Sequence, residues 1–318
     1  MKVVCLGAHI LDILGRPVTD IPAGQGRRVL DEIKLTAAGT AGGTAVDLAK
    51  LGAEVTSIGA VGDDASARML RLLLTDHGVH ISGLAEKRGS ATPSTILPIR
   101  PDGSRPALHA PGAMGLLSKD DVDLDLIAHA DALHIGGPDV LGAFGIEALP
   151  RIANHAVANG TIVSMDLLSV GRPELLADLA ALWPHVHYFL PNDDQLRALT
   201  GRDDLAEGAR MLVDRGVGTV AVTRGAEGAL LISADHILEV PALAVDVVDT
   251  TGCGDAFSAG FLVGLLSGKS LLDAAWLGTA AASQVAQGLG SDAGIVDLAS
   301  TVTLADHGRH NASGVDAK

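Results

Sequence analysis

The sequence predicts an α/β fold, with a mostly parallel central sheet, helices on both of its faces and a small second sheet beside it. Two observations carry this prediction. Short strand-like runs at residues 132–135, 161–165, 186–190 and 217–223 are separated by helical stretches, a spacing typical of parallel sheets. Two further segments, residues 14–36 and 94–109, alternate apolar with polar residues and contain prolines and glycines, which favours half-exposed strands.

Composition limits the classes of protein that the chain could be. It has 318 residues, of which 47% are hydrophobic, and a formal net charge of −15. This hydrophobic fraction excludes a disordered protein and allows one large domain. The negative charge disfavours nucleic acid and anionic membranes as partners, because both would be repelled. The longest apolar run, residues 256–266, is too short to span a bilayer.

The cysteine count favours a reducing compartment. Cys5 and Cys253 are the only cysteines, too few for a disulfide framework or a zinc cluster. His9 and Asp12 interrupt the apolar start before a signal peptide could form. We therefore expect a cytoplasmic protein, with one domain over residues 1–305 and a disordered tail over residues 306–318.

The first predicted strand, residues 3–6, ends at Gly7 and is followed by Asp12. Ligands of open α/β sheets lie beyond the carboxyl ends of the strands, so Asp12 could accept hydrogen bonds from substrate hydroxyls. An ordinary loop aspartate is the alternative.

The glycine-rich stretch at residues 38–45 precedes a helical pattern that ends at Gly52. Gly39, Gly42 and Gly43 indicate close approach of the backbone to a ligand or to packed elements. A later strand, residues 55–58, leads into a turn in which we interpret Asp63 as a helix cap.

Polar or glycine residues follow the later strands of the predicted sheet. Asp166 could touch a substrate or cap a helix, and Asn192 opens a helix start that is rich in aspartate. Thr223 is followed by Gly225 and Gly228, a pattern that suits either a phosphate-binding loop or a tight hairpin.

The most informative stretch is the glycine loop at residues 249–255, which leads into a buried helical run. Gly252 and Gly254 flank Cys253, so free N–H groups at a helix start should form an anion site. A carboxylate at Asp255 would repel phosphate there. It either caps the helix or accepts a proton from a nucleophile that attacks phosphorus.

This loop resembles the Asp-Thr-x-Gly-x-Gly-Asp motif of ribokinase-type, or phosphofructokinase-B-type, carbohydrate kinases. Weaker family motifs occur in the same order: Asp12, the glycine stretch, Asn192 and Thr223-x-Gly225. The resemblance implies a three-layer α/β/α sandwich with a small β lid. It also implies that Asp255 is the general base, and that the amides of Gly252, Cys253 and Gly254 stabilise the transferred phosphoryl group.

The resemblance assigns further residues to the ligands. The substrate-binding residues that it implies are Asp12, Gly39, Gly42, Gly43, His109 and Asp166. The nucleotide-binding residues are Asn192, Thr223, Gly225 and Gly228. A monovalent cation such as K⁺ would lie at Asp249 and Thr251, together with the later loop that includes Val285 and Gly290.

Two positions depart from the family pattern. Gly43 stands where the family has a sugar-binding asparagine. Gln195 stands at the position of a glutamate that orders Mg²⁺, although an amide is a weaker magnesium ligand than a carboxylate. A sugar acid or a phosphosugar would suit the cationic and titratable residues His109, Arg100, Arg105 and Arg172. An exposed arginine, however, is usually part of the solvated surface.

The expected function is therefore that of a kinase that uses ATP and Mg²⁺ to phosphorylate a hydroxymethyl group of a sugar. Exposed strand edges in the lid favour a homodimer. A nucleoside kinase is one alternative, although residues 1–143 contain no Phe, Tyr or Trp that could stack on a base. A non-catalytic sugar or nucleotide sensor is the other.

Overall fold

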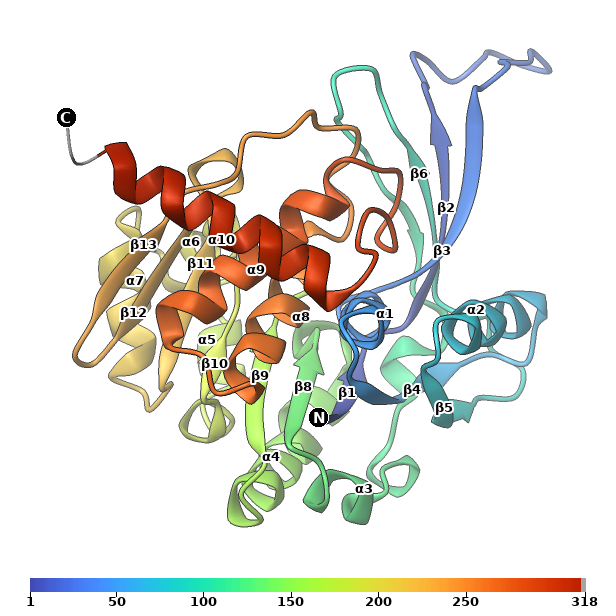
Figure 1. Cartoon of the computed structure of the whole chain (residues 1–318). Helices are drawn as coiled ribbons and strands as arrows, with labels where there is room; N and C mark the ends of the chain where they lie inside the picture. The colour runs from blue at the N-terminus through green and yellow to red at the C-terminus, as the bar shows by residue number, and fades with distance from the viewer. Residues whose placement is uncertain (316–318) are drawn as a thin grey trace.

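The computed structural model describes residues 1–315 and has three layers, with a nine-stranded sheet between two groups of helices (Figure 1). The strand order is β13-β12-β11-β10-β9-β8-β1-β4-β5. Every neighbouring pair from β11 to β5 is parallel, whereas β12 and β13 form an antiparallel hairpin at one edge. The strands are β1 (Lys2–Gly7), β4 (Glu54–Val61), β5 (His80–Glu86), β8 (Ala132–Gly136), β9 (Ile162–Asp166), β10 (Tyr188–Phe189), β11 (Thr219–Thr223), β12 (Ala229–Ser233) and β13 (Ile237–Val240).

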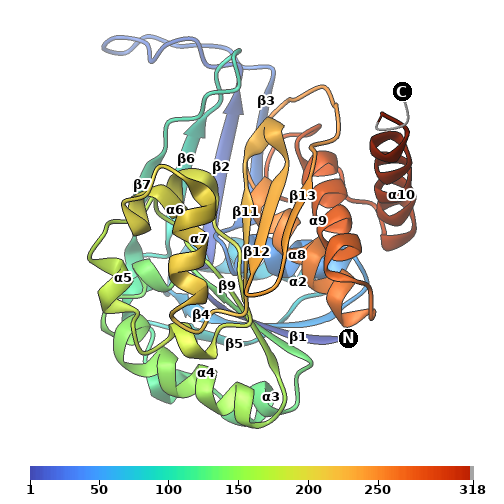
Figure 2. The ribbon, with the colours of Figure 1, turned by 90° about the vertical axis from the view of Figure 1, so that its left-hand side faces the viewer.

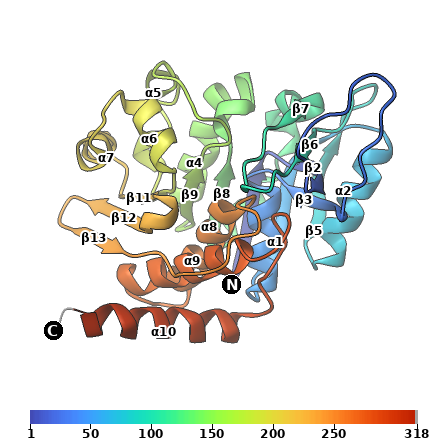
Figure 3. The same cartoon turned by 90° about the horizontal axis from the view of Figure 1, so that it is seen from above.

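Helices cover both faces of this sheet, and the central strand shows why. In β1, Val3 and Cys5 are buried in the core on one face, and Val4 and Leu6 in the core on the other. The first face is covered by α1 (Gly42–Lys50), α2 (Ala65–Asp76), α8 (Cys253–Leu266), α9 (Leu271–Val285) and α10 (Leu298–Val315). The second is covered by α3 (Leu124–Ala128), α4 (Leu149–Ala158), α5 (Leu175–Asp178), α6 (Asp193–Thr200) and α7 (Leu205–Val213). Figure 3 shows the two groups on opposite sides.

The topology marks the place of a ligand crevice. From β1 the chain proceeds outward through β4 to β5 and then returns to β8 on the other side of β1. The loops after β1 and β8 therefore diverge at their carboxyl ends, where ligands bind in open α/β sheets.

A four-stranded sheet rises from this edge and forms the lid (Figure 2). Its order is β3-β2-β6-β7, and β2 pairs with β3 in antiparallel and with β6 in parallel fashion. Its strands are β2 (Ile10–Arg16), β3 (Glu32–Ala38), β6 (Ser94–Pro98) and β7 (Leu108–Ala110). The two predicted half-exposed segments thus supply the lid, although its strands begin before residue 14 and end after residues 36 and 109.

The two faces of the lid follow from strand register. An inner row that crosses the four strands contains Thr36, Asp12, Thr95 and His109. The next residues along each strand form an outer row, because successive side chains point to opposite faces. The outer row contains Leu35, Ile13, Ile96 and Leu108.

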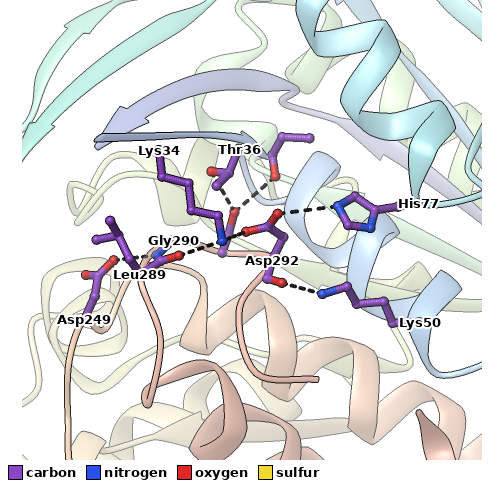
Figure 4. Close-up of polar contacts among 10 residues, drawn as sticks. Lys34, Thr36, Lys50, His77, Asp249, Leu289, Gly290 and Asp292 are labelled. Carbon is purple, nitrogen blue, oxygen red and sulfur yellow. Dashed lines mark hydrogen bonds and ion pairs between the residues drawn. The ribbon is translucent and has the colours of Figure 1, made fainter. Parts of the chain in front are cut away.

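A network of polar contacts fastens the loop after α9 to the lid and to the first two helices (Figure 4). Lys34 Nζ lies 2.6 Å from Asp292 Oδ1 and donates to the Leu289 carbonyl at 2.9 Å. On the other side, His77 Nε2 lies 3.4 Å from Asp292 Oδ2, and Lys50 donates to the Asp292 carbonyl. This loop therefore has a defined position next to the ligand crevice.

Two local predictions were wrong. Asp64, rather than Asp63, caps α2 by accepting from the Ala67 amide at 2.9 Å. The carboxylate of Asp63 accepts from Gly89 N instead. Residues 306–315, expected to be disordered, continue α10, which packs on α9 and buries Ala305. Residues 316–318 lie outside the described part of the chain. No helix in the described part is both long and apolar enough to cross a membrane.

Candidate active site

The start of α8 leaves backbone donors unpaired. Gly252 is its N-cap residue, has φ +82° and provides no side-chain cap. Within residues 1–315, the amides of Gly252, Gly254 and Asp255 have no hydrogen-bond partner, whereas the Cys253 amide donates to the Thr250 carbonyl at 3.3 Å. Two of the three expected amides are thus free, and Asp255 adds a third. Free amides at a helix start attract anions.

Asp255 lies at the first turn of α8 and is partly buried. A Cβ placed on Gly43 would come within 2.4 Å of Asp255 Oδ2. The carboxylate of Asp255 therefore fills the space that a side chain at position 43 would occupy. Burial raises the pKa of Asp255 well above its ordinary value, and the carboxylates of Asp166 and Asp12 raise it further, while Arg105 opposes them. A carboxylate in this environment is a stronger proton acceptor than an exposed one.

The inner row of the lid faces the same space. Asp12 is 6% exposed, and burial raises its pKa to about 6, although a hydrogen bond from Thr95 opposes the shift. Thr95 also contacts His109, with 3.1 Å between Oγ1 and Nδ1. These side chains form a polar strip on the lid that suits substrate hydroxyl groups.

The end of β9 supplies another buried carboxylate. Asp166 is 5% exposed, and its Oδ2 lies 3.6 Å from His134 Nε2, while Oδ1 has no hydrogen-bond partner among the described residues. Burial raises the pKa of Asp166, and His134 opposes this. Asp166 lines the first of the two cavities described below, although Oδ1 itself is shielded from it.

The glycine stretch of residues 38–45 contributes in three ways. Gly39 has φ +81° and lines the cavity, and its ideal Cβ would lie 2.6 Å from the Ala8 carbonyl oxygen. Gly42 does not line the cavity but packs near His9, and Gly43 lies under Asp255. Only Gly39 of the three borders open space.

Two adjoining cavities contain most of the predicted residues. The first, of about 540 Å³, is lined by Asp12, Gly39, His109, Asp166, Gly252 and Asp255, among others. The second, of about 720 Å³, is lined by Gly225, Gly228, Cys253 and apolar side chains from residues 242–247 and from α8 and α9. The residues that line both are Arg105, Asn192, Thr223, Thr250 and Gly254.

Gln195 has a structural role at the start of α6. Its side chain accepts from the Asn192 amide while Asn192 Oδ1 accepts from the Gln195 amide, which forms a capping box. Gln195 Nε2 donates to the carbonyls of Leu167 and Ser169 at 2.8 and 3.1 Å. A glutamate could not make both of these donations, so the departure from the family pattern has a local cause.

The predicted cation site is already well hydrogen-bonded. Asp249 is completely buried, and its carboxylate accepts from the Thr251 amide and hydroxyl and from the Gly290 amide. The Val285 carbonyl accepts from the Gly288 amide. No cluster of three or more His, Cys, Asp and Glu side chains that could hold a metal occurs within residues 1–315.

Arg105 is the residue whose position the sequence did not reveal. It comes from the segment between β6 and β7, and its Nε donates to Thr250 Oγ1 at 3.3 Å. The same Nε lies 4.0 Å from Asp249 Oδ1. The contact with Thr250 joins positions 145 residues apart. No local pattern distinguishes Arg105 from a solvated arginine, because only the pairing of the lid strands brings it over the glycine loop.

Comparisons with known proteins agree with this geometry. A family model described as pfkB family carbohydrate kinase matches residues 1–297. The chain is 29% identical over 248 residues to an uncharacterized sugar kinase of Archaeoglobus fulgidus, covering 78% of this chain and 97% of that protein. It is 31% identical over 234 residues to an aminoimidazole riboside kinase of Salmonella typhimurium, covering 70% and 72% of the two chains.

A solved structure shows the same fold. Arabidopsis thaliana ribokinase, complexed with ribose and ATP, superposes with a TM-score of 0.79 at 24% identity, covering 96% of this chain and 98% of that one. The predicted three-layer, ribokinase-like sandwich with a small lid is therefore confirmed. Because the family model extends over nearly the whole chain, the protein belongs to the pfkB family of carbohydrate kinases, which are phosphotransferases that act on an alcohol group.

Proposed function

We propose that this protein is an ATP-dependent sugar kinase in which Asp255 takes the proton of a substrate hydroxymethyl group as the γ-phosphoryl group is transferred. The observation that carries this proposal is the position of Asp255. Its carboxylate lines the first cavity next to the free amides of Gly252 and Gly254. A base and an anion site are thus adjacent, as in-line phosphoryl transfer requires.

The first cavity suits a polyhydroxylated acceptor. Asp12, Thr95 and His109 line it with polar groups from the lid, and Asp166 adds a buried carboxyl group at the end of β9. No Phe, Tyr or Trp lines this cavity among the described residues, so a nucleobase would find no aromatic ring to stack on. These features favour a sugar over a nucleoside.

The second cavity suits ATP. Its apolar wall, which includes Leu243, Val245 and Phe257, matches an adenine ring. Gly225 and Gly228 also line it, and Thr223 lines both cavities. Arg105 is the one Lys or Arg among the described residues that lines either cavity, and its place between them suits the charge of a transferring phosphoryl group.

Magnesium would enter with the nucleotide. The Gln195 amide is used in the capping box and in two bonds to carbonyls, so it does not fit the role of a magnesium ligand. Mg²⁺ retains water readily and is commonly held by substrate phosphates. We therefore assign the ion to the ATP phosphates and treat MgATP as the substrate.

A monovalent cation next to Asp249 is a further part of the proposal. The buried carboxylate has a single cationic side chain within 4.0 Å, the partly exposed Arg105, and its other partners are neutral donors. A buried anion of this kind favours a nearby cation. The melting temperature and kcat in KCl should exceed those in choline chloride at the same ionic strength. Equal values would exclude a functional K⁺ site.

We also propose a homodimer formed through the outer row of the lid. Leu35, Ile96 and Leu108 are 37%, 52% and 60% exposed on one face of the lid sheet. Contiguous apolar surface of this kind typically marks an interface. Light scattering should show a dimer that Ile96→Asp converts to a monomer. Ile237→Asp, at a 49% exposed isoleucine of β13, is the matched control.

The cysteines suit a reducing cytoplasm, where we place the enzyme. Cys5 and Cys253 are free thiols. Burial raises the pKa of Cys253 to about 12, so this thiol stays protonated beside the phosphate site and adds no charge to it.

The test is ADP release from MgATP with a panel of pentoses, hexoses, keto-deoxy acids, phosphosugars and nucleosides. We expect turnover on one sugar that is lost in Asp255→Asn. Preferred turnover of nucleosides, which the similarity to a riboside kinase makes the second candidate, would replace the sugar assignment. Binding heat for sugar or ATP without turnover would instead indicate a sensor.

A further inference from the structure

Asp47 is a buried carboxyl group for which phosphoryl transfer as described above has no role. It lies in α1 and is completely buried, and neither of its oxygens has a hydrogen-bond partner among the described residues. A buried carboxylate without partners is strongly destabilising, so its presence next to an active site calls for an explanation.

Its position on the helix directs it toward Asp255. Asp47 follows Gly43 by one helical turn, and residues four apart share a face of a helix. Helical side chains lean back toward the N-terminus, over the residue four positions earlier. That residue has no side chain, and the gap is filled from the other side by Asp255, whose Oδ2 would lie 2.4 Å from a Cβ at Gly43. Helices α1 and α8 pack directly against each other.

Burial and the surrounding charges favour the protonated form of Asp47. Burial, and then the negative charge of Asp255, raise the pKa of Asp47 well above its ordinary value, and Asp292 adds to the effect. Lys50 opposes it, but the Lys50 ammonium donates to the Asp292 carbonyl. The thiols of Cys253 on α8 and of Cys5 on β1 are raised in pKa and carry no charge.

His77, at the C-cap of α2, completes the set of titratable groups near α1, and its Nε2 contacts Asp292. Asp47 and Asp255 are thus two neighbouring carboxyl groups of raised pKa, and Asp255 is the one that must be ionised to act as the base.

We propose that Asp47 is a positioning residue for the base: it is held as a neutral carboxylic acid behind Asp255 and orients that carboxylate toward the acceptor hydroxyl by hydrogen bonding through one buried water. The Asp255 carboxylate, like that of Asp47, has no hydrogen-bond partner within residues 1–315. The inference rests on the proposed function of Asp255. The site would then use two carboxyl groups: Asp47, which carries a proton, and Asp255, which accepts one from the substrate.

The first test measures stability rather than activity. A carboxyl group that stays protonated in the folded state costs stability progressively as the pH rises above about 4, its ordinary unfolded value. Asparagine does not titrate, so it causes no such loss of stability as the pH rises. The melting temperature of Asp47→Asn minus that of the wild type should therefore rise steadily between pH 5 and pH 8. Thr44→Val, which alters another buried and unpaired side chain of α1, should show a difference that does not change with pH.

The second test measures positioning. Asp47→Ala removes the donor, and kcat should fall on the order of tenfold to a hundredfold while KM for both substrates changes little, because a misplaced group affects the chemical step. Asp47→Asn retains a donor, so it should recover a large part of that loss. Urea unfolding establishes that each variant is folded.

Each of these experiments has a result that would overturn a part of the proposal. A melting-temperature difference for Asp47→Asn that is the same at every pH would overturn the neutral acid. Equal kcat in Asp47→Ala and the wild type would overturn the positioning role. If Asp255→Asn keeps full activity while the pH slope at Asp47 is present, the assignment of Asp255 as the base has failed, rather than the protonation state of Asp47.

Discussion

Two helices, α6 and α8, begin at the junction of the two cavities, and their first turns differ. At α6, the Asn192 and Gln195 side chains occupy two backbone amides in a capping box, and Asp193 and Asp194 add negative charge. At α8, Gly252 provides no side-chain cap, and free amides face the cavity. Both starts follow a strand of the same sheet, yet only the second has the properties of an anion site.

This difference indicates which helix starts can bind an anion. Both helices have a macrodipole with its positive end at the first turn, so the macrodipole does not explain why only one start has the properties of an anion site. The deciding factor is whether the side chains near the helix start provide acceptors for the first backbone amides. A capping box satisfies them internally, whereas a glycine in the left-handed region leaves them for a ligand.

The largest expected effect is at the acidic residue of the open start. Asp255→Asn should lower kcat by about 10²- to 10⁴-fold, because it removes the general base, and calorimetry should show that MgATP still binds. Asp193→Asn, in the first turn of α6, should leave kcat near the wild-type value. A comparably active Asp255→Asn would show that Asp255 is not the base and matters no more to the chemistry than Asp193.

The next effect tests the glycine that keeps the α8 start open. Gly252→Ala would bring a Cβ within 2.4 Å of the Ser291 Cα at φ +82°. We expect a loss of about 2–4 kcal/mol in unfolding free energy, together with weaker ATP binding. Gly201→Ala, at the C-terminal end of α6, has φ +66° and no neighbour within 4 Å, so it should cost only about 1–2 kcal/mol. Urea unfolding measures both, and equal losses would mean that the contact with Ser291 is unimportant.

The pH dependence should reflect two carboxyl groups of raised pKa, Asp255 on α8 and Asp12 on the lid. Burial raises the pKa of Asp255 well above normal and that of Asp12 to about 6. Because the base must be ionised, kcat/KM should increase as the pH rises through the range in which these carboxyl groups lose their protons. Below that range, kcat/KM should fall about tenfold for each unit by which the pH is lowered. Initial rates between pH 5 and pH 8 test this. A flat profile down to pH 5 would show that Asp255 behaves as an exposed carboxylate.

A smaller effect is expected from changing the amide at position 195 while the capping box of α6 is kept. Gln195→Glu removes the two bonds that Nε2 donates to the Leu167 and Ser169 carbonyls, which should cost about 1–3 kcal/mol of unfolding free energy. Thermal denaturation at several Mg²⁺ concentrations measures the loss. If kcat instead rose with Mg²⁺ in this variant, position 195 would be a magnesium ligand rather than a cap.

The smallest effect is expected at the α6 cap itself. Asn192→Ala should cost about 1 kcal/mol of stability and raise KM for ATP only a few-fold. Asp204→Ala, at the N-cap of α7, should cost a similar amount without changing KM. A much larger rise in KM for Asn192→Ala than expected would show that its side chain binds the nucleotide directly.

Much of the fold could be predicted from the sequence because its signals are local. The strands before Gly7, at residues 132–136 and before Asp166 are short buried runs that end at polar or glycine residues, and they form where expected. The lid segments were visible as alternating patterns. The tail was not, because the pattern after Asp306 contains no long apolar face, and α10 is stabilised by its packing on α9.

By itself, the sequence determined the glycine loop, the acidic residue that follows it and the order of strands and helices, since φ preferences, caps and apolar periodicity act over a few residues. Tertiary structure decided the rest. It placed Asp255 over Gly43, directed the Gln195 amide to carbonyls beyond β9 and brought Arg105 to Thr250. These contacts join segments far apart in the chain, and only strand pairing and helix packing fix the distance between such segments.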